Sequence, residues 1–411
     1  MANDLSKRVQ QTLERQRGVV FAQPALVGRA MYTGRDIIAN NSRFAPGYQD
    51  ERGYVPVEWW IMSMTAAAND IPKPGEGVTR LILDDGDHVP LTEAAAAAGD
   101  VLFGEYLARW PLTKVLDIGG EPVVPDFGPF SRRESADRGG TGAEPEVPPI
   151  PFHVHSGEVV AGRIRPPGKL EAYFFLPVDV PPYHRDLGRV VSRLGLKPGT
   201  TREDVLAALR EFGTSDAMYA LGVAYEVRPY EGWTILPGTL HAPGPWPTFE
   251  IQLPQDDFNF AAWQLGVRVS GAQRESLRQQ MMLRGLRDEE DFLQQAVDWE
   301  TSTDPRFKER FHRKAQLLES GPWGRRLRIF FDRFYGEGIE IEPRQRYVRS
   351  ADPRPWAGIV WSGEGRLNGF RIGVRGTDAR TEFLVTPGHE AAFENDSEVT
   401  LRVYTVFPLA E

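Results

Sequence analysis

Four side chains that commonly bind metal ions lie in three short segments near the middle of the chain. PFHVHS carries His153 and His155, LEAYFFL carries Glu171, and GTLHAPG carries His241. In a β-strand, residues i and i+2 face the same side, so we expect the imidazoles of His153 and His155 to point together. The Pro-Pro-Gly signal in GRIRPPGK predicts a turn, so we expect LEAYFFL to pair with PFHVH and to bring Glu171 beside them.

This donor set suits a borderline divalent cation such as zinc, manganese, iron, cobalt or nickel. A lone His-x-His pair is more often a structural feature, but here a glutamate and a Gly-x-x-His segment follow it in order. One carboxylate and three neutral imidazoles largely balance a dication and leave open positions for a substrate. The sequence therefore predicts one divalent metal ion per chain, bound by His153, His155, Glu171 and His241.

The composition argues against several other classes of protein and site. The chain of 411 residues contains no cysteine, which excludes disulfides, thiolate nucleophiles and cysteine-ligated zinc. Its net charge of −9 argues against a nucleic-acid or anionic-membrane partner. The polar N-terminus lacks the apolar core of a signal peptide, and no run of about 18 apolar residues is present. We therefore expect a cytoplasmic protein that binds a small molecule and neither nucleic acid nor membrane; the oligomeric state stays open.

Frequent prolines and glycines between short apolar or alternating runs predict a mostly β protein. Helices are expected at 92–99, at 201–213, where Thr201 and Asp204 have capping-box spacing, and in a longer tract from about 272 to 319. The expected strands, in chain order, are KVLDI, PFHVH, LEAYFFL, MYALGVAYEV, GWTILP, TFEIQL, LRIFF, GIEIEP, GIVWSGEGRLNG, RIGVR, TEFLVTP, EAAFEN and VTLRVYTVF.

Several of these segments together resemble the type I mannose-6-phosphate isomerase family of the cupin superfamily. PFHVHS, GKLEAYF and ILPGTLHA resemble its ligand-bearing segments, and TFEIQ resembles its Tyr-Glu-Ile-Gln strand. VEWWIMS (57–63) and LFGEYLARWPLTKVLDIGGEPV (102–123) resemble two segments nearer its N-terminus. The resemblance implies a mostly β fold with two cupin-type, jelly-roll β-barrels and an added helical segment. It places a metal-binding cupin domain with N-terminal strands at 20–260, the helical segment at 261–325 and a second, metal-free cupin-like barrel at 326–411.

The resemblance also implies an activity, a metal and the residues that serve them. Members are metal-dependent aldose–ketose isomerases, in which the ion polarises a sugar carbonyl and a base moves a proton between C2 and C1. Zinc is the ion that the resemblance implies, and the ligand set also suits manganese or iron. Lys169 and Glu250 stand at catalytic positions, and Lys169 shares the strand face of Glu171. The expected substrate-binding residues are Lys114, Glu58 and Trp60.

Three departures from the family pattern concern the ligands and the substrate. His153 occupies the position of a glutamine ligand, and Pro151 that of a serine linked to the substrate phosphate. Phe260 occupies the position of an arginine that serves phosphate binding and catalysis. A phosphate dianion needs charge-assisted donors, which the side chains of proline and phenylalanine lack.

We therefore predict a metal-dependent isomerase of a monosaccharide or sugar derivative, and the departures favour a non-phosphorylated substrate over mannose 6-phosphate, which stays open. Arg163, Arg165 and Arg268 are the candidates for replacing the lost phosphate donors. Two alternative functions stay open at this point. Three histidines and a glutamate also occur in cupin metal oxidases and dioxygenases, and a non-catalytic sugar-binding protein would need the same pocket.

Overall fold

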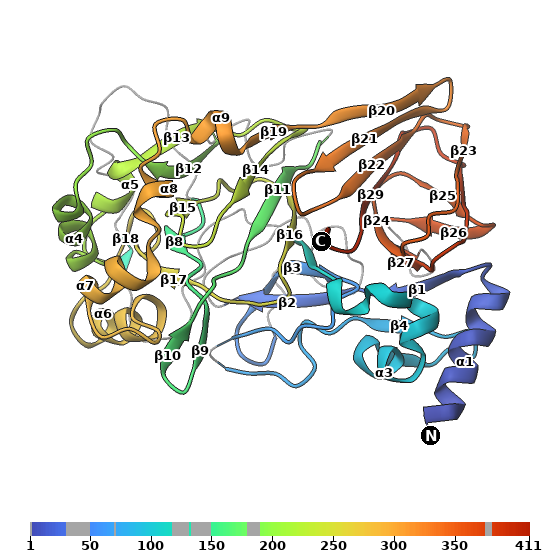
Figure 1. Ribbon diagram of the computed structural model, residues 1–411, viewed down its shortest axis with the longest axis horizontal. Coiled ribbons are helices and arrows are strands. Elements are labelled where there is room, and N and C mark those ends of the chain that lie inside the picture. Colours follow the sequence, from blue (N-terminus) through green and yellow to red (C-terminus); the bar gives the residue numbers. More distant parts are fainter. Residues whose placement is uncertain are drawn as a thin grey trace.

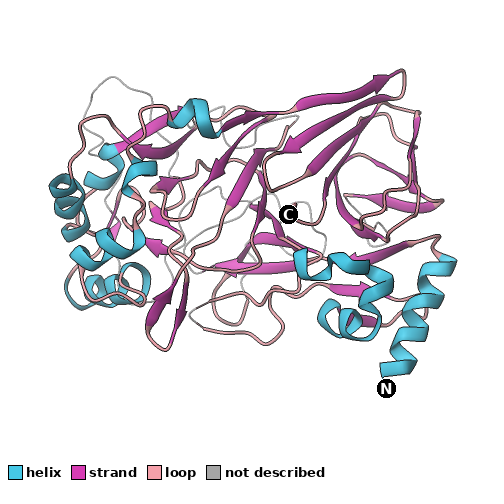
Figure 2. Cartoon of the chain, viewed as in Figure 1, coloured by secondary structure: helices cyan, strands magenta, loops and turns pink. Residues whose placement is uncertain are grey.

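Strands dominate the architecture, and the helices lie mainly at one end and along one lower edge (Figure 2). The computed structural model describes residues 2–29, 50–69, 71–116, 131–132, 149–178, 190–374 and 380–411. Within these residues, the strands form two large pairs of facing sheets, and none of the sheets closes on itself. The expected mostly β composition is confirmed, and the arrangement as two cupin-type barrels stays a prediction.

The first pair of sheets positions the predicted metal ligands. A five-stranded sheet faces a seven-stranded sheet, and an apolar cluster that includes Tyr173, Leu194 and Trp233 packs between them. In spatial order, the five strands are β13 (Gly222–Glu226), β12 (Val191–Leu196), β15 (His241–Ala242), β8 (His153–Val154) and β17 (Asn259–Phe260). The seven strands are β19 (His312–Lys314), β14 (Glu231–Ile235), β11 (Glu171–Phe175), β16 (Thr248–Gln252), β6 (Leu112–Leu116), β3 (Val55–Ile61) and β2 (Ala25–Arg29).

The second pair of sheets lies toward the other end of the molecule (Figure 1). A nine-stranded sheet faces a four-stranded sheet across a cluster that includes Phe21, Phe383 and Phe393. The nine strands are β20 (Gln316–Gly321), β21 (Gly324–Phe330), β22 (Gly336–Ile341), β29 (Leu401–Val406), β24 (Trp356–Ser362), β27 (Glu382–Val385), β1 (Val19–Gln23), β4 (Arg80–Ile82) and β5 (His88–Pro90). The four strands are β23 (Arg346–Arg349), β28 (Ala391–Asn395), β25 (Glu364–Leu367) and β26 (Phe370–Gly373).

The remaining described elements are two short strand pairs and the helices. Two further antiparallel pairs are β9 (Glu158–Val160) with β10 (Arg163–Arg165), and β7 (Ser131–Arg132) with β18 (Val267–Arg268). The helices are α1 (Ala2–Arg15), α3 (Leu91–Leu102), η1 (Gly104–Arg109), α4 (Arg202–Arg210), α5 (Ala217–Leu221), α6 (Gly271–Leu277), η3 (Arg278–Met282), α7 (Glu289–Asp291), η4 (Phe292–Ala296), α8 (Trp299–Ser302) and α9 (Phe307–Phe311). Thr201 and Asp204 form the expected capping box at the start of α4. In the part of the chain that the structure describes, no helix is both long and apolar enough to cross a membrane.

Alternation along the strands separates the apolar core from the site. At the five-stranded sheet, Phe152 packs into an apolar cluster that also contains residues of helices α4, α5 and α6. Its neighbour His153 points the other way, toward the seven-stranded sheet. In the seven-stranded sheet, Val115, Phe174 and Phe249 pack into a cluster shared with the nine-stranded sheet. The opposite face of the same strands carries the side chains that approach the histidines: Lys114, Glu171, Tyr173 and Glu250.

The expected pairing of the two ligand-bearing strands is wrong. β11 pairs with β14 and β16 in the seven-stranded sheet, whereas β8 pairs with β15 and β17 in the five-stranded sheet. The Pro-Pro-Gly segment therefore follows a separate hairpin, β9–β10, and does not join two neighbouring strands. As a consequence, Glu171 meets the histidines across the space between two sheets.

Two expected elements also differ in type. The segment MYAL is part of helix α5, and the strand begins only at Gly222. The helical tract ends at Phe311, and the residues after it form β19, which extends the seven-stranded sheet beside β14, and β20, which pairs with β21. The division into domains at 20–260, 261–325 and 326–411 stays a prediction. The strands β1, β4 and β5 lie in one sheet with the C-terminal strands.

Candidate metal centre

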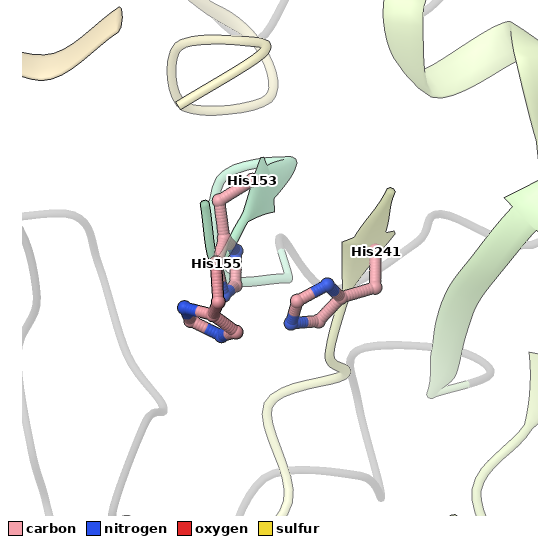
Figure 3. A group of neighbouring side chains, drawn as sticks. All are labelled: His153, His155 and His241. Atoms are coloured by element: carbon pink, nitrogen blue, oxygen red, sulfur yellow. The ribbon is translucent and has the colours of Figure 1, made fainter. Parts of the chain in front are cut away.

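Three imidazoles converge in the space between the five-stranded and seven-stranded sheets (Figure 3). His153 begins β8, His155 follows that strand directly, and His241 begins the neighbouring strand β15, where it pairs with His153. One ring nitrogen of each histidine lies within 4.8 Å of those of the other two, and all three side chains are buried. The structure therefore brings together the three predicted histidine ligands in a group that can hold a metal ion.

Backbone carbonyls fix which nitrogen of each ring faces the site. The Nδ1 atom of every one of the three rings lies within hydrogen-bond distance of a carbonyl oxygen. The acceptors are Pro151 for His153, Asp257 for His155 and Thr239 for His241, at 2.7, 2.6 and 2.7 Å. Because a carbonyl only accepts, Nδ1 must carry the proton, and in a neutral imidazole Nε2 then presents its lone pair. Burial lowers the pKa of His153 and of His155, which favours this neutral form.

Glu171 faces these lone pairs from the opposite sheet. Its Oε2 lies 3.2 Å from Nε2 of His155, and its Oε1 lies 3.2 Å from Nε2 of His241. Burial opposes its charge, whereas the ammonium of Lys169 beside Oε2 favours that charge and lowers the pKa of Glu171. Neither Nε2 atom has a hydrogen-bond partner among the described residues. Lone pairs that face a carboxylate without a proton between them repel, so the donor set fits a cation held among these atoms.

Two further side chains hold the carboxylate of Glu171 in place. Lys169 Nζ lies 2.8 Å from Glu171 Oε2, and it also lies 2.8 Å from Oε1 of Gln252. The hydroxyl of Tyr173 donates to Glu171 Oε1. Burial opposes the charge of Lys169, but Glu171 and Glu250 outweigh it and raise the pKa of this lysine above its ordinary value. Lys169 is therefore an ammonium ion that orients the carboxylate beside the three imidazoles.

Glu250 is the one carboxylate in this group with a raised pKa. It lies on β16 between two lysines, with Oε1 at 3.4 Å from Nζ of Lys169 and at 3.4 Å from Nζ of Lys114. Its side chain is almost completely buried. Burial raises the pKa of Glu250 to about 7 against the opposing effect of Lys114. The side chain can therefore change its protonation state near neutral pH.

Beyond Lys114, buried charges of alternating sign continue away from the three histidines. Lys114 Nζ lies 3.5 Å from Glu58 Oε2, and Arg29 Nε donates to Glu58 Oε1 at 2.7 Å. Arg29 also donates to both oxygens of Asp256 at 3.0 Å. The indole of Trp60 donates to Glu58 at 2.7 Å and is fully buried, one layer behind these charges. Of the three expected substrate-binding residues, Lys114 and Glu58 line a pocket between the two sheets, and Trp60 holds Glu58 from behind.

A pocket opens onto the centre between the two sheets, and its described lining contains three cations and five carboxylates. The cations are Arg29, Lys114 and Lys169, and the carboxylates are Glu58, Glu171, Glu250, Asp256 and Asp257. With the histidines neutral, the lining carries an excess of negative charge that a divalent cation would compensate. Each of the three cations already contacts two of the carboxylates.

The residues at the three departures from the family pattern all lie at this site. Phe260 lines the pocket beside His153, with ring centroids 6.1 Å apart, and Pro151 supplies the carbonyl that fixes the His153 tautomer. The candidate replacement arginines lie elsewhere in the described structure. Arg163 and Arg165 are exposed on the β9–β10 hairpin, and Arg268 pairs with an aspartate outside the pocket.

Sequence reasoning missed several residues of this site, among them Arg29, Tyr173, Gln252 and Asp256. Strand alternation could have found Tyr173, which lies two residues after Glu171, and Gln252, which lies two residues after Glu250. No local signal marks the other two. Arg29 reaches the site because β2 pairs with β3, and its partner Asp256 lies in the loop after β16.

No protein-family model matches the chain, and no curated protein matches it by sequence. Its structure is similar to solved structures. A protein from Archaeoglobus fulgidus described as a mannosephosphate isomerase is 15% identical, with a TM-score of 0.58, and the match covers 96% of this chain and 98% of that one. The mannose 6-phosphate isomerase from Bacillus subtilis is 13% identical, with a TM-score of 0.57 and coverage of 94% and 99%. A phosphomannose isomerase variant from Salmonella typhimurium is 12% identical, with a TM-score of 0.51 and coverage of 95% and 99%. The chain therefore shares the fold of these isomerases over nearly its whole length.

Proposed function

We propose that the protein is a metal-dependent aldose–ketose isomerase that acts on a non-phosphorylated sugar or sugar derivative. The observation that carries the proposal is the convergence of three imidazoles and Glu171 beside the buried pair of Lys169 and Glu250. The shared fold with mannose-6-phosphate isomerases supports the same class of reaction. The proposed ligands are His153, His155, Glu171 and His241, and the proposed ion is zinc, with manganese or iron as alternatives.

The side chains around the ligands suit a reaction that moves a proton between two adjacent carbons. A divalent ion in this site supplies Lewis acidity to a carbonyl and its neighbouring hydroxyl. We assign the proton transfer to Glu250, because a carboxyl group with a pKa of about 7 can both accept and return a proton near neutral pH. Lys169, as an ammonium ion beside Glu250, can donate a hydrogen bond to oxygen charge that develops during the transfer. Lys114 and Glu58 line the pocket further on, where they can bind sugar hydroxyls.

The charge of the pocket supports a neutral substrate. Arg29 donates to Glu58, Asn69 and Asp256, which engages most of its guanidinium hydrogens. Lys114 and Lys169 are each held between two carboxylates. A phosphate dianion would therefore enter a lining in which every described cation is already paired. Each charge-assisted hydrogen bond that phosphate cannot form costs roughly 1.5–3 kcal/mol of binding free energy.

The test is a side-by-side assay of unphosphorylated and phosphorylated aldoses with the protein loaded with zinc or manganese. Exchange of the C2 proton in deuterated water and formation of the ketose are followed by NMR. We expect exchange with neutral aldoses and little with their phosphates. Efficient turnover of mannose 6-phosphate alone would overturn the substrate assignment, and absence of exchange with every aldose would overturn the isomerase assignment.

Two variants separate the proposed roles. Glu250→Gln should keep the metal and lose C2 exchange, whereas His241→Ala should lose both. Oxygen consumption with the same sugars should be absent, and its presence would favour a metal oxidase instead. Sugar binding without exchange in the metal-loaded protein would favour a binding protein.

A further inference from the structure

The pocket has an apolar flank that the proposed chemistry does not use. Five apolar residues line it together with the charged groups: Leu116, Ile150, Pro243, Phe258 and Phe260. Leu116 and Ile150 form a small buried cluster, and the amide of Ile150 donates to the carbonyl of Pro243. The rings of Phe258 and Phe260 lie 5.0 Å apart. We call these five residues the apolar flank.

Strand register places part of this flank at a distance from the reacting end of the substrate. Glu250 pairs with Lys114, and Leu116 lies two residues further along β6 on the same face, about 7 Å away at the usual strand rise. Leu116 in turn pairs with Glu58, whose carboxylate is engaged by Arg29, Lys114 and Trp60. An extended sugar that reacts beside Glu250 would therefore reach Leu116 and Ile150 with the carbons remote from its carbonyl.

The flank offers no hydrogen-bonding side chain to a polar group at that remote end. Its five side chains are hydrocarbon, and the three cations nearby are each held by two carboxylates. Among the described residues, the five side chains of the flank offer a hydroxymethyl group or a phosphate that packs against them no replacement for its hydrogen bonds to water. A methyl group would instead remove apolar surface from water against the same side chains.

We propose that the apolar flank selects a substrate whose remote terminus is apolar, such as a 6-deoxy aldose, over the corresponding hexose or hexose 6-phosphate. This inference rests on the proposed isomerase function for the orientation of the sugar. It goes further than the absence of a phosphate site, because it also ranks two neutral sugars that differ by one hydroxyl. An apolar pocket typically disfavours an isostere that adds a hydroxyl by about a hundredfold.

The test compares matched pairs of sugars with the metal-loaded, full-length protein. For the manno, gluco and galacto configurations, C2 exchange and calorimetric binding are measured for the 6-deoxy aldose, the parent hexose and the 6-phosphate. We expect kcat/KM for the best 6-deoxy aldose to exceed that of its parent hexose by about a hundredfold, and binding to follow the same order. A parent hexose or its phosphate that reacts or binds as well as the 6-deoxy sugar would overturn the inference while leaving the isomerase function intact.

Failure of the proposed function gives a different result. If no aldose exchanges its C2 proton, the isomerase proposal fails, and the binding order of the deoxy and parent sugars still decides the inference. Equal binding of the two sugars, or binding of neither, would then overturn it.

Two pairs of nearly isosteric variants test the flank itself. At position 150, Ile150→Val and Ile150→Thr introduce side chains of the same shape, one with a methyl where the other has a hydroxyl. At position 258, Phe258→Leu and Phe258→Asn introduce side chains of similar size, one apolar and one with an amide. The valine and leucine variants should keep the preference for the 6-deoxy sugar. The threonine and asparagine variants should reduce it by roughly tenfold, because each supplies a partner to the parent hydroxyl. Equal preferences within both pairs would show that the flank does not select the substrate.

Discussion

Replacing Glu250 by glutamine should change how the stability of the metal-free protein depends on pH. Burial raises the pKa of Glu250 from 4.5 to about 7 in the folded protein, whereas the unfolded chain titrates at the ordinary value. The folded state therefore binds this proton more tightly. Between pH 4.5 and about 7 it carries more protons than the unfolded state, and its stability falls as the pH rises. Glutamine cannot ionise, so the variant lacks this contribution.

The magnitude follows from the size of the pKa change. A shift from 4.5 to about 7 corresponds to about 3 kcal/mol of unfolding free energy across the window. The neighbouring carboxylates should contribute little in this range. Burial opposes the charge of Glu58 and of Asp256, but Arg29 and Lys114 keep the pKa of each below its ordinary value, at about 2 for Glu58. Both groups therefore stay ionised throughout the window.

Urea unfolding of the chelator-treated protein at intervals between pH 4.5 and 8 measures the effect. The unfolding free energy of wild type minus that of Glu250→Gln should fall by about 3 kcal/mol as the pH rises. Glu158→Gln, on the exposed strand β9, is the matched control and should leave the wild-type curve unchanged. A difference that stays flat, or that grows with pH, would refute the claim that burial dominates the titration of Glu250.

Three other predictions concern the metal ligands, their support and the helical end of the molecule. His241→Ala should lower the metal content of protein purified without chelator, measured by elemental analysis, from about one ion per chain to a small fraction. The control is His312→Ala, which removes a histidine that pairs with Glu231 and should leave the metal content unchanged. Tyr173→Phe removes the hydroxyl that donates to Glu171 and should weaken metal affinity by about 10–100-fold, measured by competition with a chromophoric chelator. Circular dichroism should show that the variant keeps its fold. Thr201→Ala breaks the capping box of α4 and should lower the unfolding free energy by about 1 kcal/mol, whereas Thr201→Ser should not.

The sequence was informative where a local pattern fixes the outcome. Period-two alternation in PFHVHS predicted that His153 and His155 face one side, and the structure places both imidazoles in the group with His241. The capping box at Thr201 depends only on residues of its own turn and was predicted correctly. Glu171 was also expected beside the histidines, although the route by which it arrives there was predicted wrongly.

The failures concern pairings between distant segments. Nothing within residues 312–321 distinguishes a helix from an edge strand, because the strand exists only through its partners β14 and β21. Asp256 and Arg29 are far apart in the chain, and their ion pair depends on the packing of β2 against β3 and of the loop after β16. Such contacts follow from tertiary structure, and single-sequence patterns carry no record of them.

The chain crossing between the two sheets explains why the proposed metal ligands have this spacing. After His155 the chain leaves the five-stranded sheet, forms the β9–β10 hairpin and returns to pass directly beside His155 before it begins β11. At the crossing, a side chain on Gly168 would place its Cβ 1.9 Å from the carbonyl oxygen of His155, and one on Gly157 would lie 2.3 Å from the carbonyl oxygen of Arg165. Only glycine allows the backbones to approach so closely. The two glycines therefore let one short segment supply proposed ligands to both walls of the site, with His153 and His155 on one side and Glu171 on the other.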